Sequence, residues 1–184
     1  MAMKFSDLPQ AKKAAIGEQI VDNYLRQNGF IPYHPSEIDG AHPFDRLVAS
    51  KDKKRIFIGE IKTKPARFHY PDTGINKKSY QEYQYIHEKY GIRIFLFFVD
   101  EKKGEIYGNY LDLLDKKRIE HRRDGKYVQY PLEQSTINRT SIRYWPTSAM
   151  ELICKLDNAQ IEMLCEHTTR SKQYEELYER NNRA

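Results

Sequence analysis

The feature that most constrains the fold is the run RIFLFFVD at residues 93–100, which is almost continuously apolar. Short apolar runs without alternation are typical of strands that are buried on both faces of a sheet. Two amphipathic stretches, residues 7–28 and 76–90, have the apolar spacing expected of helices that cover such a sheet. The sequence therefore predicts an α/β fold in which helices flank a central β-sheet.

Three further strands are predicted around this run. Residues 43–50 and 55–64 are rich in β-branched and aromatic side chains, and the polar link KDKK joins them. Residues 105–111 follow the apolar run after the turn EKKG and supply a partner strand. The resulting order is helix, two strands, helix, two strands, which indicates a mixed central sheet in one domain.

The chain is expected to divide near residue 110. Residues 1–110 should form the principal core, and residues 111–184 a helical C-terminal extension packed on it, within a single domain overall. The extension is expected to hold a short helix, then a hairpin across Gly125, then two or three C-terminal helices. Candidate caps for those helices are Ser148 and Asp157.

Composition restricts the class of protein. Hydrophobic residues make up 39% of the chain and charged residues 31%, which indicates a folded, soluble protein. No apolar run approaches the ~20 residues of a membrane span, and the first residues lack the apolar core of a signal peptide, so we expect a cytoplasmic protein. Cys154 and Cys165 fit no zinc motif and are expected to be free thiols. The net charge of +5 gives only weak support for a polyanionic partner.

A charged pair, Glu60 and Lys62, lies near the end of the strand at residues 55–64, in a run otherwise suited to burial. Side chains alternate between the two faces of a strand, so these two point to the same face. A connection of two or of four residues within KDKK gives the same register, and both place Asp45 directly opposite Glu60. The alternative is that this strand end is solvent-exposed and that the pair has no chemical role.

Two facing carboxylates destabilise a sheet unless a cation binds between them. Hard divalent ions such as Mg²⁺ bind carboxylate oxygens and keep several waters, and Lys62 could orient one of those waters or meet a phosphate oxygen. Such a set suits metal-assisted hydrolysis of phosphodiester bonds, in which the metal activates water and neutralises charge on phosphorus. Motifs of other chemistries, namely HExxH, GxGxxG, the P-loop and GxSxG, do not occur in the sequence.

This pattern resembles the PD-(D/E)xK nuclease superfamily, which includes restriction enzymes, archaeal Holliday-junction resolvases and RecB-type nucleases. The resemblance is carried by PFD, which ends at Asp45, by GEIKTK, which contains Glu60 and Lys62, and by IGEQIVDNYL, which contains Glu18. It implies a restriction-endonuclease-like core over roughly residues 7–110 and a metal ion bound by Asp45, Glu60 and Glu18. Lys62 would assist the attacking water. The sequence departs from the motif in that phenylalanine, not proline, directly precedes Asp45.

The resemblance also suggests where a nucleic acid would bind. Gln81 and Tyr85 match a Gln-x-x-x-Tyr motif of RecB-like members, with aromatic packing as the alternative for both. Basic and aromatic residues near the site can contact phosphates or stack on bases, unless they serve packing or solvation instead. The candidate substrate contacts are Lys64, Arg67, Tyr70, Lys77, Lys78, Gln81 and Tyr85, with Arg46, Phe68 and His69 as further candidates.

Together these features predict a Mg²⁺-dependent nuclease, in which Mn²⁺ could replace Mg²⁺, with DNA favoured over RNA as the nucleic acid bound. We expect an endonuclease of the restriction type or of the recombination and phage type. The alternative is a non-catalytic module that retains the fold and binds nucleic acid or protein. A homodimer is compatible with both, because cutting both strands of a duplex often calls for two sites and the C-terminal helices can supply a contact.

Overall fold

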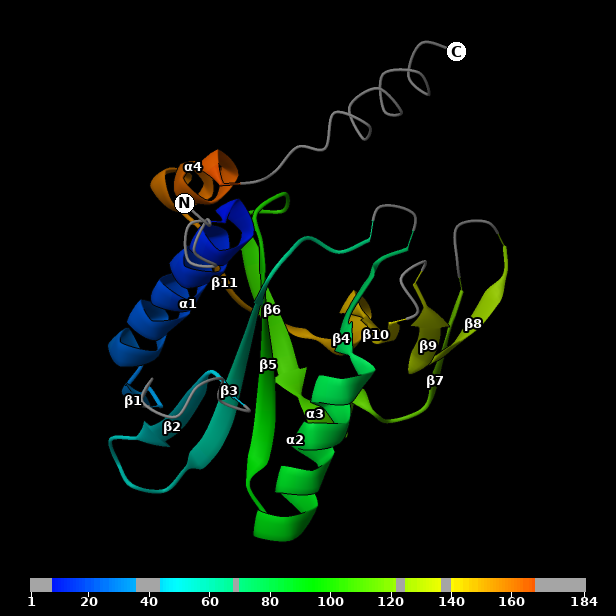
Figure 1. Cartoon of the computed structure of the whole chain (residues 1–184), viewed down its shortest axis with the longest axis horizontal. Helices are drawn as coiled ribbons and strands as arrows, with labels where there is room; N and C mark the ends of the chain where they lie inside the picture. Colours follow the sequence, from blue (N-terminus) through cyan, green and yellow to red (C-terminus); the bar gives the residue numbers. More distant parts are fainter. Residues whose placement is uncertain (1–7, 36–43, 68–69, 122–124, 137–139, 168–184) are drawn as a thin grey trace, which may run out of the picture.

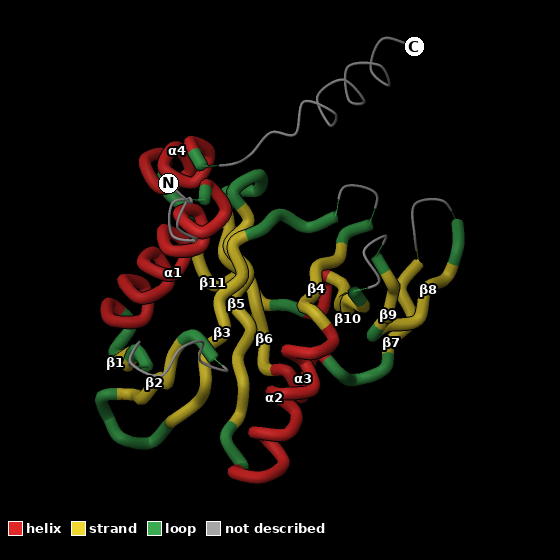
Figure 2. Tube along the Cα trace, in the orientation of Figure 1, coloured by secondary structure: helices red, strands yellow, loops and turns green. Residues whose placement is uncertain are grey.

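The computed structural model of the chain describes residues 8–35, 44–67, 70–121, 125–136 and 140–167. Its centre is a six-stranded sheet (Figure 1, Figure 2). In spatial order the strands are β1 (Phe30–Tyr33), β2 (Arg46–Ser50), β3 (Ile56–Thr63), β5 (Arg93–Asp100), β6 (Glu105–Tyr110) and β11 (Glu151–Lys155). β3 and β5 run parallel, whereas every other neighbouring pair is antiparallel. The sheet is therefore mixed, as predicted.

Helices flank both faces of this sheet. α1 (Pro9–Gln27) and α4 (Asn158–Glu166) lie on one side, and α2 (Lys77–Tyr90) and the short α3 (Leu111–Leu114) lie on the other (Figure 1). Two hydrophobic clusters fill the spaces between, one beneath α1 and α4 and one beneath α2 and α3. We call the two sides of the sheet the α1 face and the α2 face. No helix in the described part of the chain is both long and apolar enough to cross a membrane.

The apolar run at residues 93–100 is β5, and it lies inside the sheet as expected. Leu96 and Phe98 are fully buried in the cluster of the α2 face. Val99 is fully buried in the cluster of the α1 face. Because both faces of this strand are covered, its sequence lacks the polar and apolar alternation of a half-exposed strand.

The N-terminal half has the predicted order of helix, strands, helix and strands, with β1 as an additional strand. Helix α1 is followed by the antiparallel meander β1, β2 and β3, then by α2, and then by β5 parallel to β3. The short strand β1, within FIPY, is not predicted by its apolar pattern. It forms because its backbone pairs along β2, from Phe30 opposite Ser50 to Tyr33 opposite Leu47.

A second, three-stranded sheet lies beside α2 (Figure 2). Its strands are β4 (Asp72–Asn76), β10 (Ser141–Pro146) and β9 (Leu132–Ser135), in that order. The sequence pattern does not predict β4. This segment carries a proline before it and a glycine within it, and it becomes a strand only because β10, distant in sequence, pairs with it.

The C-terminal extension is less helical than expected. The hairpin across Gly125 is confirmed as β7 (Arg118–His121) and β8 (Tyr127–Tyr130), and Asp157 caps α4 through a capping box with Gln160. Ser148, however, lies in a 3-10 turn, and its hydroxyl donates to Glu120 at 2.7 Å. The residues between these features form β9, β10 and β11. β10 pairs with β4 and β11 with β6, both far away in the sequence, whereas β9 pairs with the neighbouring β10.

The two ends of α2 differ in how well they follow from the sequence. α2 ends at Gly91, which has a left-handed backbone with φ of 68°, a conformation that suits glycine. Asn76 precedes α2 but makes no side-chain cap. Ser6 and Asp7, which are of a residue type that can cap α1, lie outside the described residues. Both cysteines are free thiols, as expected.

α1 packs closely against the end of β3 at Gly17. An ideal Cβ built on Gly17 would lie 1.9 Å from the Thr63 hydroxyl oxygen and 3.0 Å from the Thr63 Cβ. A methyl group does not fit this space. Gly17 thus allows α1 to approach the strand that carries Glu60 and Lys62.

Replacing Gly17 by alanine tests this contact. Helix propensity alone predicts that Gly17→Ala stabilises the protein by about 1 kcal/mol. The contact predicts the opposite sign, a loss of about 1–3 kcal/mol, because overpacking displaces side chains and backbone. Urea unfolding measures the difference, and Gly17→Ala combined with Thr63→Ala should recover part of the loss. Ala15→Gly, at an exposed position of the same helix, is the control for propensity. Stability of Gly17→Ala equal to wild type or above it would contradict the contact.

Candidate active site

The register between β2 and β3 is the one predicted from the KDKK link. Ser50 N–H donates to the Arg55 carbonyl at 2.9 Å, so the link is a four-residue loop. The pairing continues to Arg46 opposite Gly59. Asp45 directly precedes β2, and one of its carboxylate oxygens accepts a hydrogen bond from Ile61 N–H at 2.7 Å. The Asp45 carboxylate is therefore anchored at the strand position next to Glu60.

Glu60 is a buried carboxylate, and only one of its two oxygens has a partner in the described part of the chain. Its residue is only 2% exposed, and it forms an ion pair with Lys62 through Oε1. The other oxygen, Oε2, is buried and has no hydrogen-bond partner among the described residues. Burial raises the pKa of Glu60; Lys62 opposes this shift and the negative charge of Asp45 adds to it. A carboxylate oxygen left without a donor at this depth is suited to bind a cation.

Lys62 carries its charge at neutral pH. Burial by itself lowers the pKa of Lys62, but the carboxylates of Glu60 and Asp45 outweigh burial and raise it. The side chain is 36% exposed, so the ammonium group can reach solvent or a bound molecule. It therefore acts as a hydrogen-bond donor and a positive charge beside the two carboxylates.

Glu18 lies near this group but is held by Arg46. The Arg46 guanidinium donates to Glu18 at 3.0 Å and to the two oxygens of Asp22 at 2.9 and 3.2 Å. Burial raises the pKa of Glu18, and repulsion from Asp45 adds to the shift. That repulsion places Glu18 within electrostatic range of the carboxylate pair. Asp22 was not predicted from the sequence, although Glu18 and Asp22 are one helical turn apart, where two like charges destabilise a helix unless a cation compensates them.

Arg46 has a structural role in the described part of the chain. Its side chain is buried, and besides Glu18 and Asp22 it binds the Asp45 carbonyl oxygen at 2.7 Å. It thus ties the residue before β2 to helix α1. This geometry leaves little of the guanidinium for a phosphate, contrary to the role considered for it from sequence.

The residue of α2 that faces the site is Tyr83. It is buried, and burial together with the negative charge of Glu60 raises its pKa well above the ordinary value. Gln81 and Tyr85, the predicted pair, are instead exposed, and the Tyr85 hydroxyl accepts a hydrogen bond from Lys89 at 2.8 Å. Tyr80 and Tyr83 are the buried residues of α2, so the three-residue spacing of aromatic side chains was the available signal.

Most of the predicted substrate contacts are engaged within the protein. The Lys64 ammonium donates to the Gly74 carbonyl, and burial first, then the charges of Lys62 and Arg67, lower the pKa of Lys64 to about 8. Arg67 binds Asp72 with two nitrogens, each at 2.6 Å. Arg67 also lies over the rings of Tyr144 and Tyr70.

The remaining candidates for substrate contacts differ in whether their charges are already paired within the protein. Lys77 forms an ion pair with Glu133 at 2.7 Å. Lys78 is exposed and has no ion pair with any described residue, so it is the least constrained of the predicted phosphate contacts. Phe68 and His69 lie outside the described residues.

The residues at the end of β3 fit a hard divalent cation in number and kind. Within the described ranges no group of three or more acidic, histidine or cysteine side chains is arranged as a metal site. Mg²⁺ needs less than that, because it keeps several waters and is often bound by one or two carboxylates. Glu60 Oε2, which lacks a donor, and the Asp45 carboxylate beside it meet that requirement.

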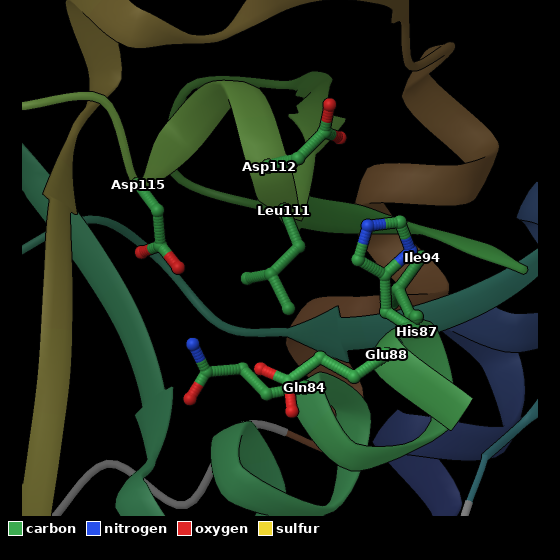
Figure 3. Close-up of a pocket in the computed structure, with 7 residues that line it drawn as sticks. All are labelled: Gln84, His87, Glu88, Ile94, Leu111, Asp112 and Asp115. Atoms are coloured by element: carbon green, nitrogen blue, oxygen red, sulfur yellow. The ribbon is translucent and has the colours of Figure 1, made fainter. Parts of the chain in front are cut away.

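A pocket of about 170 Å³ lies elsewhere, between α2, the start of β5 and α3 (Figure 3). Its lining residues are Gln84, His87, Glu88, Ile94, Leu111, Asp112 and Asp115. None of the predicted site residues lines it. Asp112 is paired with Arg93, and Asp115 accepts from Tyr80, Arg143 and Trp145. Both aspartates of the pocket are therefore already paired within the protein.

The fold and the site together define a mixed α/β protein with two carboxylates and a lysine at the end of a central strand. No protein-family model matches the chain, and no curated protein matches it. Among solved structures it is similar to Hjc, a Holliday junction resolvase from the archaeal hyperthermophile Archaeoglobus fulgidus. The TM-score is 0.40 and the sequence identity 13%, with 55% of this chain and 80% of that chain covered.

Replacing Asp45 by asparagine should lower the pKa of Glu60. Asparagine keeps an oxygen for Ile61 N–H but removes the charge that raises this pKa. NMR titration of the glutamate side-chain carboxyl carbons measures the pKa directly. Asp112→Asn, a change in α3 away from the site, is the matched control.

The same change should alter the pH dependence of stability. Because the pKa of Glu60 is raised in the folded state, its favourable contribution is complete below the unfolded pKa and is lost as pH rises through the folded pKa. Asp45→Asn should bring the folded pKa of Glu60 closer to its unfolded pKa, and so narrow the pH range over which this contribution to stability is lost. An unchanged Glu60 titration would show that the two carboxylates do not interact.

Proposed function

We propose that this protein is a metal-dependent nuclease that hydrolyses phosphodiester bonds, with DNA as the favoured substrate. The observation that carries the proposal is the buried Glu60 carboxylate, which has a free oxygen, lies beside Asp45 and is paired with a charged Lys62. A sheet gains no stability from two carboxylates in this position, so their retention favours a site that binds a cation.

Each residue of the site has a distinct proposed task. Asp45 and Glu60 would hold a divalent metal, Mg²⁺ or Mn²⁺, with Glu18 near enough to add a carboxylate if it leaves Arg46. When bound, that metal would activate water and neutralise charge on the phosphate. Lys62 would donate a hydrogen bond to the attacking water or to a phosphate oxygen, which lowers the cost of the developing negative charge. Tyr83 would limit the conformations of Glu60 by packing beside it.

The polymer and the type of cleavage belong to the same proposal. We favour an endonuclease of the restriction or recombination type, because the carboxylates lie at a strand end on the sheet rather than in an enclosed cavity. A non-catalytic module that binds nucleic acid is the alternative. It would keep the fold and the metal site without hydrolysis. Metal binding without cutting would therefore identify the module, and metal-dependent cutting the nuclease.

Cleavage of supercoiled plasmid and of short RNA tests the activity. Lys62→Met keeps the length of the side chain without its charge, and Glu60→Gln keeps the shape without the charge. Both should reduce metal-dependent cutting by about 10²- to 10⁴-fold, since each removes a group that acts on the attacking water or the charge on phosphorus. Lys155→Met, at an exposed position of β11, is the matched control and should cut like wild type. Cutting at the wild-type rate by both Lys62→Met and Glu60→Gln would show that Glu60 and Lys62 do not form the active site.

Metal binding has a readout that is independent of cutting. Mn²⁺ at about 100 times its dissociation constant should raise the melting temperature of the wild type by about 5–10 °C, because binding to the folded state alone adds about 2.7 kcal/mol. Asp45→Asn and Glu60→Gln should abolish the increase, whereas Asp112→Asn should retain it. Melting is followed by circular dichroism, with excess EDTA to reverse the effect. Equal increases in wild type and both site variants would contradict a metal site here.

A further inference from the structure

An apolar surface lies on the α2 face of the sheet, over β1, β2 and the first half of β3. α2 packs over β4, β5 and β10 and leaves this part of the sheet uncovered in the described structure. Two cross-strand rows form it: Ile31, Ala49 and Ile56, then Tyr33, Leu47 and Ile58. Ile31, Tyr33 and Ile56 are 39%, 52% and 57% exposed. We call Ile31, Tyr33, Ala49 and Ile56 the exposed sheet face.

One end of the exposed sheet face leads to the candidate active site. Cross-strand partners share a face of the sheet, and residues two apart along a strand lie on the same face. Beyond the row of Tyr33, the next position on this face is that of Asp45 and Glu60. A strand rises about 3.4 Å per residue, so the carboxylates follow the Tyr33 row by about 7 Å and the Ile56 row by about 14 Å.

The other end of the face meets a positively charged turn. Lys51, Lys53, Lys54 and Arg55 are all exposed in the loop between β2 and β3. The single acid of the loop, Asp52, accepts hydrogen bonds from the Ser50 hydroxyl at 2.5 Å and from Lys54 N–H at 3.1 Å. The three lysines form no ion pair with other described residues. An apolar surface with unpaired cations at one end and a proposed phosphodiester site at the other suits a polyanion with apolar groups.

We propose that the exposed sheet face binds an unpaired strand of nucleic acid and leads it to Glu60. This inference rests on the proposed nuclease function and specifies its substrate as single-stranded, or as a duplex with an unpaired segment. The ring of Tyr33 would stack on a base, while Lys51, Lys53 and Lys54 would neutralise phosphates. A regular duplex has its base faces stacked inside, so it would leave this apolar surface without a partner.

A second copy of the chain fits the same surface less well. β1 is an edge strand of the sheet, and such edges can pair with another chain. Pro32 lies in the middle of β1 and has no backbone N–H, which is a common protection against strand addition. A second copy would supply an apolar face but no polyanion for the unpaired lysines of the turn, since the chain carries a net charge of +5. Charge complementarity therefore favours a nucleic acid.

Binding measured in EDTA tests the proposal without cleavage. The probes are fluorescein-labelled oligo(dT) of about 16 nucleotides and a duplex of the same length, followed by fluorescence anisotropy. Tyr33→Ala should weaken binding of the single strand by about 5- to 100-fold, the effect of losing one stacked base, and should leave duplex binding unchanged. Tyr33→Phe, which keeps the ring, should bind like wild type. Tyr127→Ala is the matched control, because Tyr127 is 74% exposed on β8, outside this surface.

The charged turn gives a second readout. Lys54→Ala should reduce the slope of log affinity against log salt by about 0.7, the value for one phosphate contact on a single strand. Lys155→Ala, on the opposite edge strand β11, should leave the slope unchanged.

Three results would overturn the proposal. The first is single-strand affinity of Tyr33→Ala equal to wild type, and the second is an equal loss of duplex binding. The third is a dimer in sedimentation that Tyr33→Ala dissociates without any change in affinity, which would assign the face to a second copy. Failure of the single-strand proposal can be told apart from failure of the nuclease proposal, because plasmid cutting that depends on Lys62 would still establish the active site.

Discussion

The pairing of β2 with β3 in one register is the constraint on which the rest of the site depends. A slip of one residue would move every side chain of β2 to the other face of the sheet. Arg46 would then lose Asp22 and Glu18, and Val48 would leave the cluster beneath α1. The buried guanidinium and the buried valine therefore select the register, and the register brings Asp45 to Glu60. The chemical site follows from packing on the opposite face of the same strand.

The charges of the site are divided between the two faces of the sheet. On the α2 face, Lys62 partly compensates Glu60 and leaves one carboxylate oxygen without a partner. On the α1 face, Arg46 compensates Asp22 and Glu18. A buried carboxylate without full compensation costs free energy that hydrophobic packing elsewhere must offset. The complete ion pairing on the α1 face is consistent with a structural role. The carboxylate oxygen without a partner on the α2 face is consistent with a chemical role.

Local patterns predicted the parts of the fold that local interactions determine. The apolar run of β5, the helix stop at Gly91 and the cap at Asp157 all follow from neighbouring residues, and the KDKK loop was enough to set the register of Asp45. β4 could not be predicted, because it is a strand only through its distant partner β10. Tyr83 was missed for a related reason: the motif indicated Gln81 and Tyr85, but the side of α2 that meets Glu60 is decided by packing against the sheet.

The last described strand and helix complete structures begun by the first residues of the chain. β11 forms one edge of the central sheet, and Leu164 of α4 is fully buried in the same cluster as Val21 of α1. α1 packs on β1 and β3, which follow it closely in the sequence, but its contact with α4 can form only when almost the whole described chain is present. Contacts of such long sequence separation slow folding, because the loop between them must be closed before the contacts form.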